Sequence, residues 1–186
     1  MPTVSDDRSL DDLQRSLEYL LEEEGGWSDH PSDRGGATFN GVTQVTYDDY
    51  RSRVKKLPKQ SVRKATASEI KEVYDVLYWR AARCDRLPWP ISYLTFDAAV
   101  NSGVSRGVRW TQAGLGVEAD GQVGKATIGA AQTATDQGSA KVLLSIVDQR
   151  VEFLARLVQR TPSQAAFLLG WWRRTMRVLS RALLSE

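Results

Sequence analysis

The stretch from Leu20 to Thr43 holds the acidic residues best placed to do chemistry. Glu24 stands at the end of a leucine-spaced helical pattern, directly before Gly25 and Gly26, and Asp33 follows it in a glycine-rich, polar segment. A carboxyl at a helix C-terminus faces the negative end of the helix dipole, so its pKa is raised. A general acid that works near neutral pH needs such a rise. Two carboxyls with unequal pKa values are what glycoside hydrolysis uses.

Leucines at helical spacing indicate the helix that must carry Glu24. The predicted buried face of this helix consists of Leu10, Leu13, Leu17 and Leu20 or Leu21. Glu24 follows Leu20 by four residues and continues this face, whereas Glu22 and Glu23 fall off it. The plain alternative is a solvated run of three glutamates at a frayed helix end. The local sequence leaves both interpretations open.

The other elements predicted from the pattern are helices, apart from one small hairpin. Residues 35–43, GGATFNGVT, have the glycines and β-branched residues of a hairpin or extended loop, and Thr43 can cap the helix that follows. Thr66 and Glu69 form a capping box. Further helices are expected over 90–103, 108–115 and 139–158, and Thr127 is expected to cap a short helix before the last of these. A final helix is expected from Pro162 onward, with Trp171 and Trp172 in the core. The pattern therefore indicates a mainly α fold with a minor β-hairpin.

Several motifs in order along the chain resemble a known family. EGGWSDHPSDRGGATFNGVTQVTYDDYR at 24–51, YWRAARCDRLP at 78–88 and FDAAVNSG at 96–103 are similar to the glycoside hydrolase family 108 lysozymes, muramidases of phages and bacteria that include many endolysins. ADGQVGKAT at 119–127 resembles the signature of the predicted peptidoglycan-binding segment that usually follows. The resemblance covers nearly the whole chain.

This resemblance implies a lysozyme-like helical fold with a glycine-rich loop beside the active-site cleft. Residues 1–90 would form the catalytic region and 91–186 a helical peptidoglycan-binding region, packed as one unit. Glu24 would protonate the glycosidic oxygen between N-acetylmuramic acid and N-acetylglucosamine. Asp33 would stabilise the oxocarbenium-like charge or orient water, with Thr38 holding that water. The residues expected at the substrate are Trp27, Thr43, Asp97 and Asn101.

Three of these expectations keep a structural alternative. Trp27 could stack on a sugar or pack against the helix end. Asp97 and Asn101, four residues apart on one helical face, could line the cleft or form a hydrogen-bonded structural pair. The family often has Tyr at the position of Trp27, and its frequent Asp-Pro is here His30-Pro31, which favours Asp33 as the second carboxylate.

Composition and charge narrow the classes of protein that fit the sequence. The 186 residues carry a net charge of +2, so no strongly nucleic-acid-like charge balance exists, although the C-terminal part is basic and could attract an anionic wall polymer or membrane surface. A single cysteine, Cys84, excludes an internal disulfide. The N-terminus lacks a signal-peptide pattern and the longest apolar run is too short to span a bilayer. We therefore expect the protein to be made in the cytoplasm and to act on peptidoglycan in the periplasm or cell wall. A holin, or an injection or secretion machinery, would deliver it there. A monomer is the default expectation for its oligomeric state.

Other wall-cleaving chemistries can be compared by their demand for residues. A zinc amidase needs several His or Cys ligands and a Cys/His peptidase needs a reactive pair, but His30 and Cys84 are the only such residues, so no metal or cofactor is expected. A plain buried thiol is the expectation for Cys84. A lytic transglycosylase that uses Glu24, and a non-catalytic wall-binding or phage structural module, stay open as alternatives.

Overall fold

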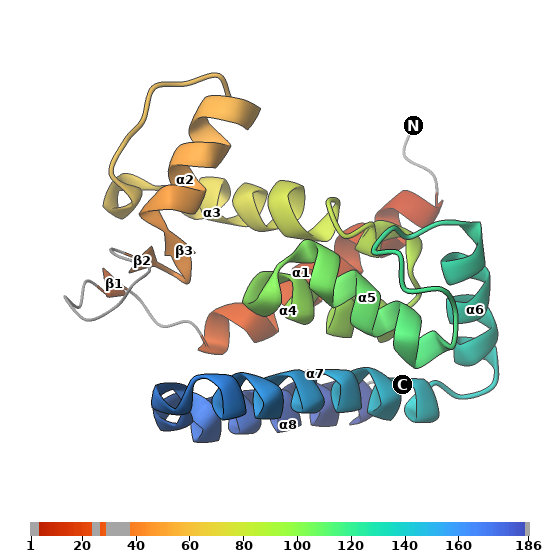
Figure 1. Cartoon of the computed structure of the whole chain (residues 1–186). Helices are drawn as coiled ribbons and strands as arrows, with labels where there is room; N and C mark the ends of the chain where they lie inside the picture. Colours follow the sequence, from red (N-terminus) through yellow and green to blue (C-terminus); the bar gives the residue numbers. More distant parts are fainter. Residues whose placement is uncertain (1–3, 24–26, 29–37, 185–186) are drawn as a thin grey trace.

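The computed structural model of the chain describes residues 4–23, 27–28 and 38–184, and it is mainly helical (Figure 1). The α-helices are α1 Val4–Glu23, α2 Gln44–Asp49, α3 Ala67–Tyr74, α4 Ile91–Ser102, α5 Val104–Leu115, α6 Lys125–Asp136, α7 Ala140–Arg160 and α8 Leu168–Leu184. The strands are β1 Trp27–Ser28, β2 Thr38–Phe39 and β3 Val42–Thr43. Short helical turns are η1 Tyr50–Val54, η2 Val62–Lys64, η3 Asp75–Trp79, η4 Cys84–Arg86 and η5 Pro162–Phe167. The expected mainly α, lysozyme-like fold is confirmed.

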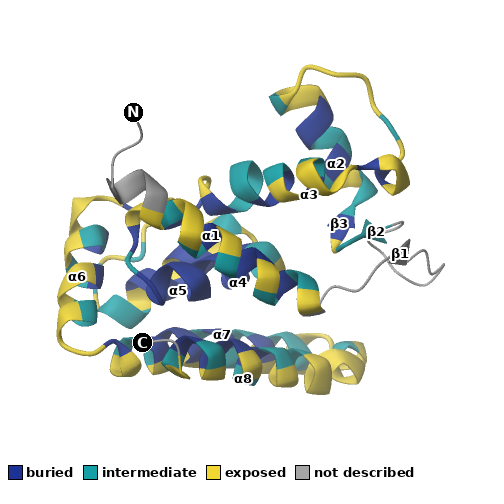
Figure 2. Ribbon diagram, turned by 180° about the vertical axis from the view of Figure 1, so that it is seen from behind, coloured by how far each residue is buried: buried dark blue, intermediate teal, exposed yellow. Residues whose placement is uncertain are grey.

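The helices form layers around α4. Figure 1 shows α7 and α8 lying antiparallel beneath α1, α4 and α5, with α2, α3 and the strands on the opposite side and α6 at one edge. Nine consecutive residues of α4, from Ile91 to Ala99, are buried. A helix that is apolar nearly all round belongs inside a fold rather than on its surface. Figure 2 shows this central burial, with exposure increasing toward the end of the α7–α8 pair.

The leucine pattern predicts most, but not all, of the buried face of α1. Leu13, Leu17 and Leu20 are buried as expected. Leu10 is 53% exposed, which contradicts its assignment to that face. Leu10 instead lines the open groove between α1 and the α3–η3 segment, so its helical spacing does not bring full burial.

A small antiparallel sheet follows α1 along the chain. β2 pairs with β3 as the predicted hairpin, and its turn residues Asn40 and Gly41 have φ values of 48° and 75°. Positive φ at both central residues is the geometry of the tight hairpin turn that Asn-Gly favours. β1 adds a third strand that the sequence did not predict, with Trp27 opposite Phe39.

Two local expectations are wrong. α6 has Gly124 rather than Thr127 as its N-cap, and Thr127 is instead buried and accepts a hydrogen bond from Gln112 Nε2 at 3.2 Å. Trp172 is 46% exposed rather than in the core. It lies in the first turns of α8, and none of the described helices covers it fully.

Candidate active site

The candidate site lies where α1 ends and the chain enters the sheet. α1 ends at Glu23, so Glu24 is the next residue in the chain, and both Glu24 and Asp33 lie outside the described residues. Their proposed roles therefore stay predictions. The structure does define what holds the two ends of this segment.

Arg181 of α8 forms hydrogen bonds to the last turn of α1 and holds it in place. Its guanidinium donates to the Tyr19 carbonyl oxygen at 3.0 Å and to Glu22 Oε2 at 2.6 Å, and lies 4.7 Å from the centre of the Tyr19 ring. Tyr19 packs edge-to-face on Tyr93 of α4 at 5.5 Å. A cation at a helix C-terminus interacts favourably with the exposed carbonyl end of the helix. The turn that leads into Glu24 is thus positioned by both α8 and α4.

The sheet brings two of the predicted residues together. Thr38 lies opposite Ser28 in β1 and opposite Thr43 in β3. Directly opposed residues in an antiparallel pair project from the same face of a sheet. Thr43 also caps α2, because its Oγ1 accepts from the Thr46 backbone N–H at 3.2 Å. Thr38 is held in the middle strand of a sheet whose far edge is anchored to α2.

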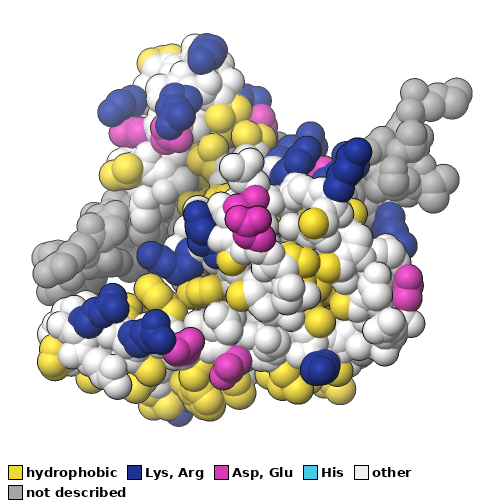
Figure 3. All heavy atoms as spheres, turned by 45° about the vertical axis from the view of Figure 1, so that its right-hand side comes forward, with side chains coloured by type: hydrophobic (Ala, Val, Ile, Leu, Met, Phe, Trp, Pro, Cys, Tyr) yellow, Lys and Arg dark blue, Asp and Glu magenta, His cyan; other side chains and the backbone are white. Residues whose placement is uncertain are grey.

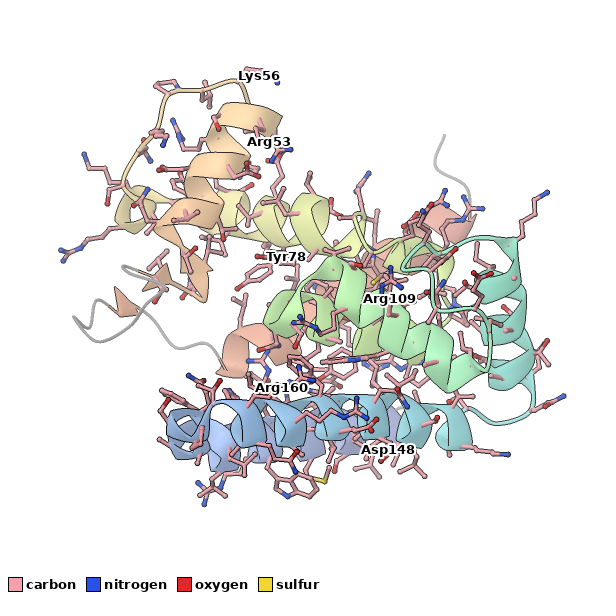
Figure 4. All side chains as sticks on the ribbon, in the orientation of Figure 1. Arg53, Lys56, Tyr78, Arg109, Asp148 and Arg160 are labelled. Atoms are coloured by element: carbon pink, nitrogen blue, oxygen red, sulfur yellow. The ribbon has the colours of Figure 1, made fainter. Side chains whose placement is uncertain are left out.

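Helix α3 anchors the hairpin from the other side. The Tyr74 hydroxyl donates to the Asn40 carbonyl oxygen in the hairpin turn at 2.9 Å. Tyr78, in η3, packs against Tyr74 with ring centres 5.9 Å apart. Figure 4 shows Tyr78 between the layer of α2 and α3 and the layer of α1 and α4. An aromatic ring that is only half-buried at this position could contact a sugar face.

A groove between α1 and α3 leads toward the same end of α1. It has a volume of about 550 Å³, and its residues on α1 run from Leu10 to Leu21, while Ser68, Lys71 and Asp75 come from the α3 side. Glu72 lines it as well and accepts from Lys55 and from the Tyr50 hydroxyl, and these contacts hold the pKa of Glu72 below its usual value. Apolar residues with a few fixed polar groups are typical of a ligand groove.

Asp97 and Asn101 form a hydrogen-bonded pair. The Asn101 amide donates to the Asp97 carbonyl oxygen at 2.8 Å and to its Oδ1 at 3.3 Å. Asp97 is 3% exposed, and its carboxylate accepts from Arg150 of α7 at 2.5 Å and from Arg174 of α8 at 2.9 Å. Burial alone would raise the pKa of Asp97, but the two arginine charges outweigh it and lower that pKa. This describes the structural alternative for the pair, and a contact with substrate stays a prediction.

We call Asp97, Arg150 and Arg174 the buried ion cluster. It connects α4 to both α7 and α8. The sequence reasoning missed Arg150, Arg174 and Arg181. Asp97 itself indicated that partners such as Arg150 and Arg174 must exist, because a lone carboxylate in an apolar helix requires a cationic partner.

Among the residues that the structure describes, no group of three or more His, Cys, Asp or Glu side chains could hold a metal ion. Cys84 is buried, and burial raises the pKa of its thiol well above the usual value. A nucleophilic cysteine needs an accessible thiolate. The expectation of a plain buried thiol is confirmed.

Comparisons with known proteins agree with the arrangement of these elements. Residues 17–103 match the model of glycosyl hydrolase 108, and residues 106–176 match that of a predicted peptidoglycan domain. The fold is similar to the structure of Brucella abortus SagA, with a TM-score of 0.78 and 29% identity over 92% of this chain and 94% of that one. A search of curated proteins finds no match to the chain.

Proposed function

Residues 17–103 belong to glycosyl hydrolase family 108 and residues 106–176 to a predicted peptidoglycan domain, and from this membership we propose that the chain is a muramidase. The coarse activity, a glycosidase directed at peptidoglycan, follows from the two families. The proposal adds the bond, which is the β-1,4 link between N-acetylmuramic acid and N-acetylglucosamine, and the residue that breaks it, Glu24.

The observation that carries the proposal is the fixed end of α1. Glu24 follows directly on a helix whose last turn is bonded to Arg181 and packed on Tyr93 through Tyr19. The negative helix end favours the protonated carboxyl, which is the form that a general acid must have. A rigid helix end is a better base for a catalytic group than a free loop.

Asp33 and Thr38 complete the proposed chemistry. In this proposal Asp33 faces the developing positive charge on the sugar or orients a water molecule, and Thr38 helps to hold that water. Support for Thr38 comes from its place in the middle strand, opposite Thr43. The residues predicted at the substrate, Trp27, Thr43, Asp97 and Asn101, remain proposed contacts. Tyr78 joins them because of its position between the two layers. The separation of the two carboxyls decides between retention and inversion.

The proposed place of action is peptidoglycan outside the cytoplasmic membrane. No helix among the described residues is long and apolar enough to cross a membrane. Delivery would rest on a holin or on an injection or secretion machinery. The predicted peptidoglycan domain supports the wall polymer as the partner.

Digestion of purified peptidoglycan by wild type, Glu24→Gln and Glu23→Gln tests the proposal. The neighbouring Glu23 is a matched control because it lies off the buried face of α1 in the helical pattern. Products are identified by mass spectrometry before and after borohydride reduction. We expect reducible muramic acid ends from wild type and from Glu23→Gln, and a loss of about 10²–10⁴-fold for Glu24→Gln.

Each competing activity predicts a different product. Anhydro-muramic ends would identify a lytic transglycosylase that uses the same residue. An absence of cleavage by folded wild type would leave a non-catalytic wall-binding or phage structural module. New free amino termini would place the cleavage in the peptide stems and overturn the proposal.

A further inference from the structure

The end of η5 and the first turns of α8 carry the densest group of exposed apolar side chains among the described residues. We call Phe167, Leu168, Leu169 and Trp172 the apolar tip; their exposed fractions are 57%, 39%, 58% and 46%. Figure 2 shows exposed residues at this end of the α7–α8 pair. Figure 3 shows hydrophobic side chains gathered along the lower edge of the molecule, over these two helices, with Lys or Arg side chains beside them. Isolated exposed leucines are ordinary, but a contiguous group of this kind marks a contact surface.

The apolar tip is ordered by the helix that carries it. Phe167 stacks on Trp171 with ring centres 5.9 Å apart and planes inclined by 28°. α8 is fixed to the body of the protein by Arg174 on Asp97 and by Arg181 on Glu22. The tip is therefore presented on a rigid helix, and its exposure follows from the fold.

The segment of chain that carries the apolar tip is basic. Between Phe153 and Ser185 the chain has six arginines and no aspartate or glutamate. Two of the arginines of α8, Arg174 and Arg181, turn inward onto acids of other helices. The other two, Arg173 and Arg177, are exposed and follow Leu169 at helical spacing. Exposed apolar groups and exposed arginines thus share the N-terminal part of α8.

This combination fits an anionic lipid surface better than the other occupants. The tip lies within residues 106–176, which match a predicted peptidoglycan domain, so the wall polymer is the main competing occupant. Phe167 and Trp172 offer flat rings to a glycan strand, but the exposed Leu168 and Leu169 offer it neither a ring nor a hydrogen bond, whereas an acyl boundary accepts all four side chains. A two-fold contact through the tip would bring two copies of this basic segment together, and the segment has no acid to compensate its arginines. Lipid headgroups supply the negative charge, and the acyl boundary accepts Trp, Phe and Leu.

We infer that the apolar tip and the adjacent Arg173 and Arg177 bind peripherally to a membrane surface rich in anionic phospholipid. The apolar side chains enter the headgroup and acyl boundary, and the arginines contact lipid phosphates. The helix lies on the surface and does not span it. This binding is independent of the glycosidase chemistry proposed for Glu24.

Co-sedimentation of the full chain with lipid vesicles tests the inference. The vesicles are phosphatidylglycerol mixed with phosphatidylethanolamine, with phosphatidylcholine alone as the neutral comparison. We expect binding to the anionic vesicles that weakens with salt, because screening reduces the arginine contribution. Arg173→Gln/Arg177→Gln lowers the partition by about 30-fold at low salt. Leu169→Ser/Trp172→Ser lowers it by about tenfold or more.

Matched controls carry the same changes elsewhere on the surface. Lys56→Gln/Lys64→Gln removes two exposed charges near α2, and Leu57→Ser removes an exposed leucine there. These variants bind like wild type if the apolar tip is the membrane site. Circular dichroism melting of every variant separates lost binding from lost folding.

Three results would overturn the inference. The first is equal binding of the tip variants and wild type to anionic vesicles. The second is a concentration-dependent increase in mass, by light scattering without lipid, that Leu169→Ser/Trp172→Ser abolishes, which would assign the tip to self-association. The third is that the tip variants bind vesicles like wild type but no longer sediment with purified peptidoglycan, which would assign the apolar tip to the wall polymer.

Discussion

Removal of the Asp97 charge measures how much the buried ion cluster contributes to the free energy of unfolding. Asp97→Asn keeps the size of the side chain but leaves Arg150 and Arg174 without their counter-charge. The side chains of these three residues are only 4%, 9% and 12% exposed, so water cannot replace the lost partner easily. Breaking a buried ion pair by removing one member costs about 3–5 kcal/mol. For a chain of this size the loss corresponds to a fall in melting temperature of about 6–20 °C.

The acid dependence of stability follows from the lowered pKa of Asp97. A carboxyl whose pKa is lower in the folded protein stabilises the fold above its unfolded pKa of about 3.9, and this contribution disappears as the pH falls through the folded pKa. The gap in unfolding free energy between wild type and Asp97→Asn should therefore be constant near neutral pH. It should shrink only below about pH 4.

Urea unfolding followed by circular dichroism at several pH values measures this gap. Asp75→Asn is the control, because its partner Arg80 is 63% exposed and such a pair contributes less than about 1 kcal/mol. Single replacement of Arg150 by Met should cost less than Asp97→Asn, since Asp97 keeps Arg174. A loss below about 1 kcal/mol for Asp97→Asn would refute the reasoning. A raised KM with unchanged stability would assign Asp97 to the substrate instead.

Two further predictions concern the ends of the candidate site. Arg181→Gln removes the positive charge at the end of α1 and so should raise the pKa of Glu24, which moves the alkaline limb of the kcat/KM profile to higher pH. Glu22→Gln removes a negative charge there and should move that limb to lower pH. Shifts in the same direction for both variants would contradict this prediction. Tyr74→Phe leaves the Asn40 carbonyl without its hydroxyl donor and should lower the unfolding free energy by about 1 kcal/mol in urea titrations, whereas a wild-type midpoint would show that the bond adds nothing.

Local signals explain which parts of the fold the sequence predicts. Thr66 with Glu69 forms the expected capping box, and residues 35–43, expected as a hairpin or extended loop, contain the β2–β3 hairpin, because each feature depends on residues close together in the chain. The apolar run that forms α4 was also predicted as a buried helix from its local sequence. These features need no knowledge of the partners in space.

Long-range contacts explain what the sequence could not supply. Arg150 and Arg174 are 53 and 77 residues from Asp97, so nothing in the local pattern pairs them. The exposure of Trp172 was missed for a related reason, since helical spacing shows an apolar face but not where the covering helices end. In the candidate site, the chemistry of Glu24 was inferred from position and resemblance, whereas its support by Arg181 required the fold.

The bond from Arg181 to the last turn of α1 also has a consequence during synthesis. α1 leaves the ribosome before α8, which lies later in the chain. Until α8 has been made, the turn that leads into Glu24 lacks its arginine contact. A partly translated chain without α8 therefore lacks the Arg181 contact to the last turn of α1, and we expect its glycosidase activity to appear only after α8 has been made. The same dependence means that residues 17–103 cannot be transplanted alone into a chimaera without losing the contact that α8 makes.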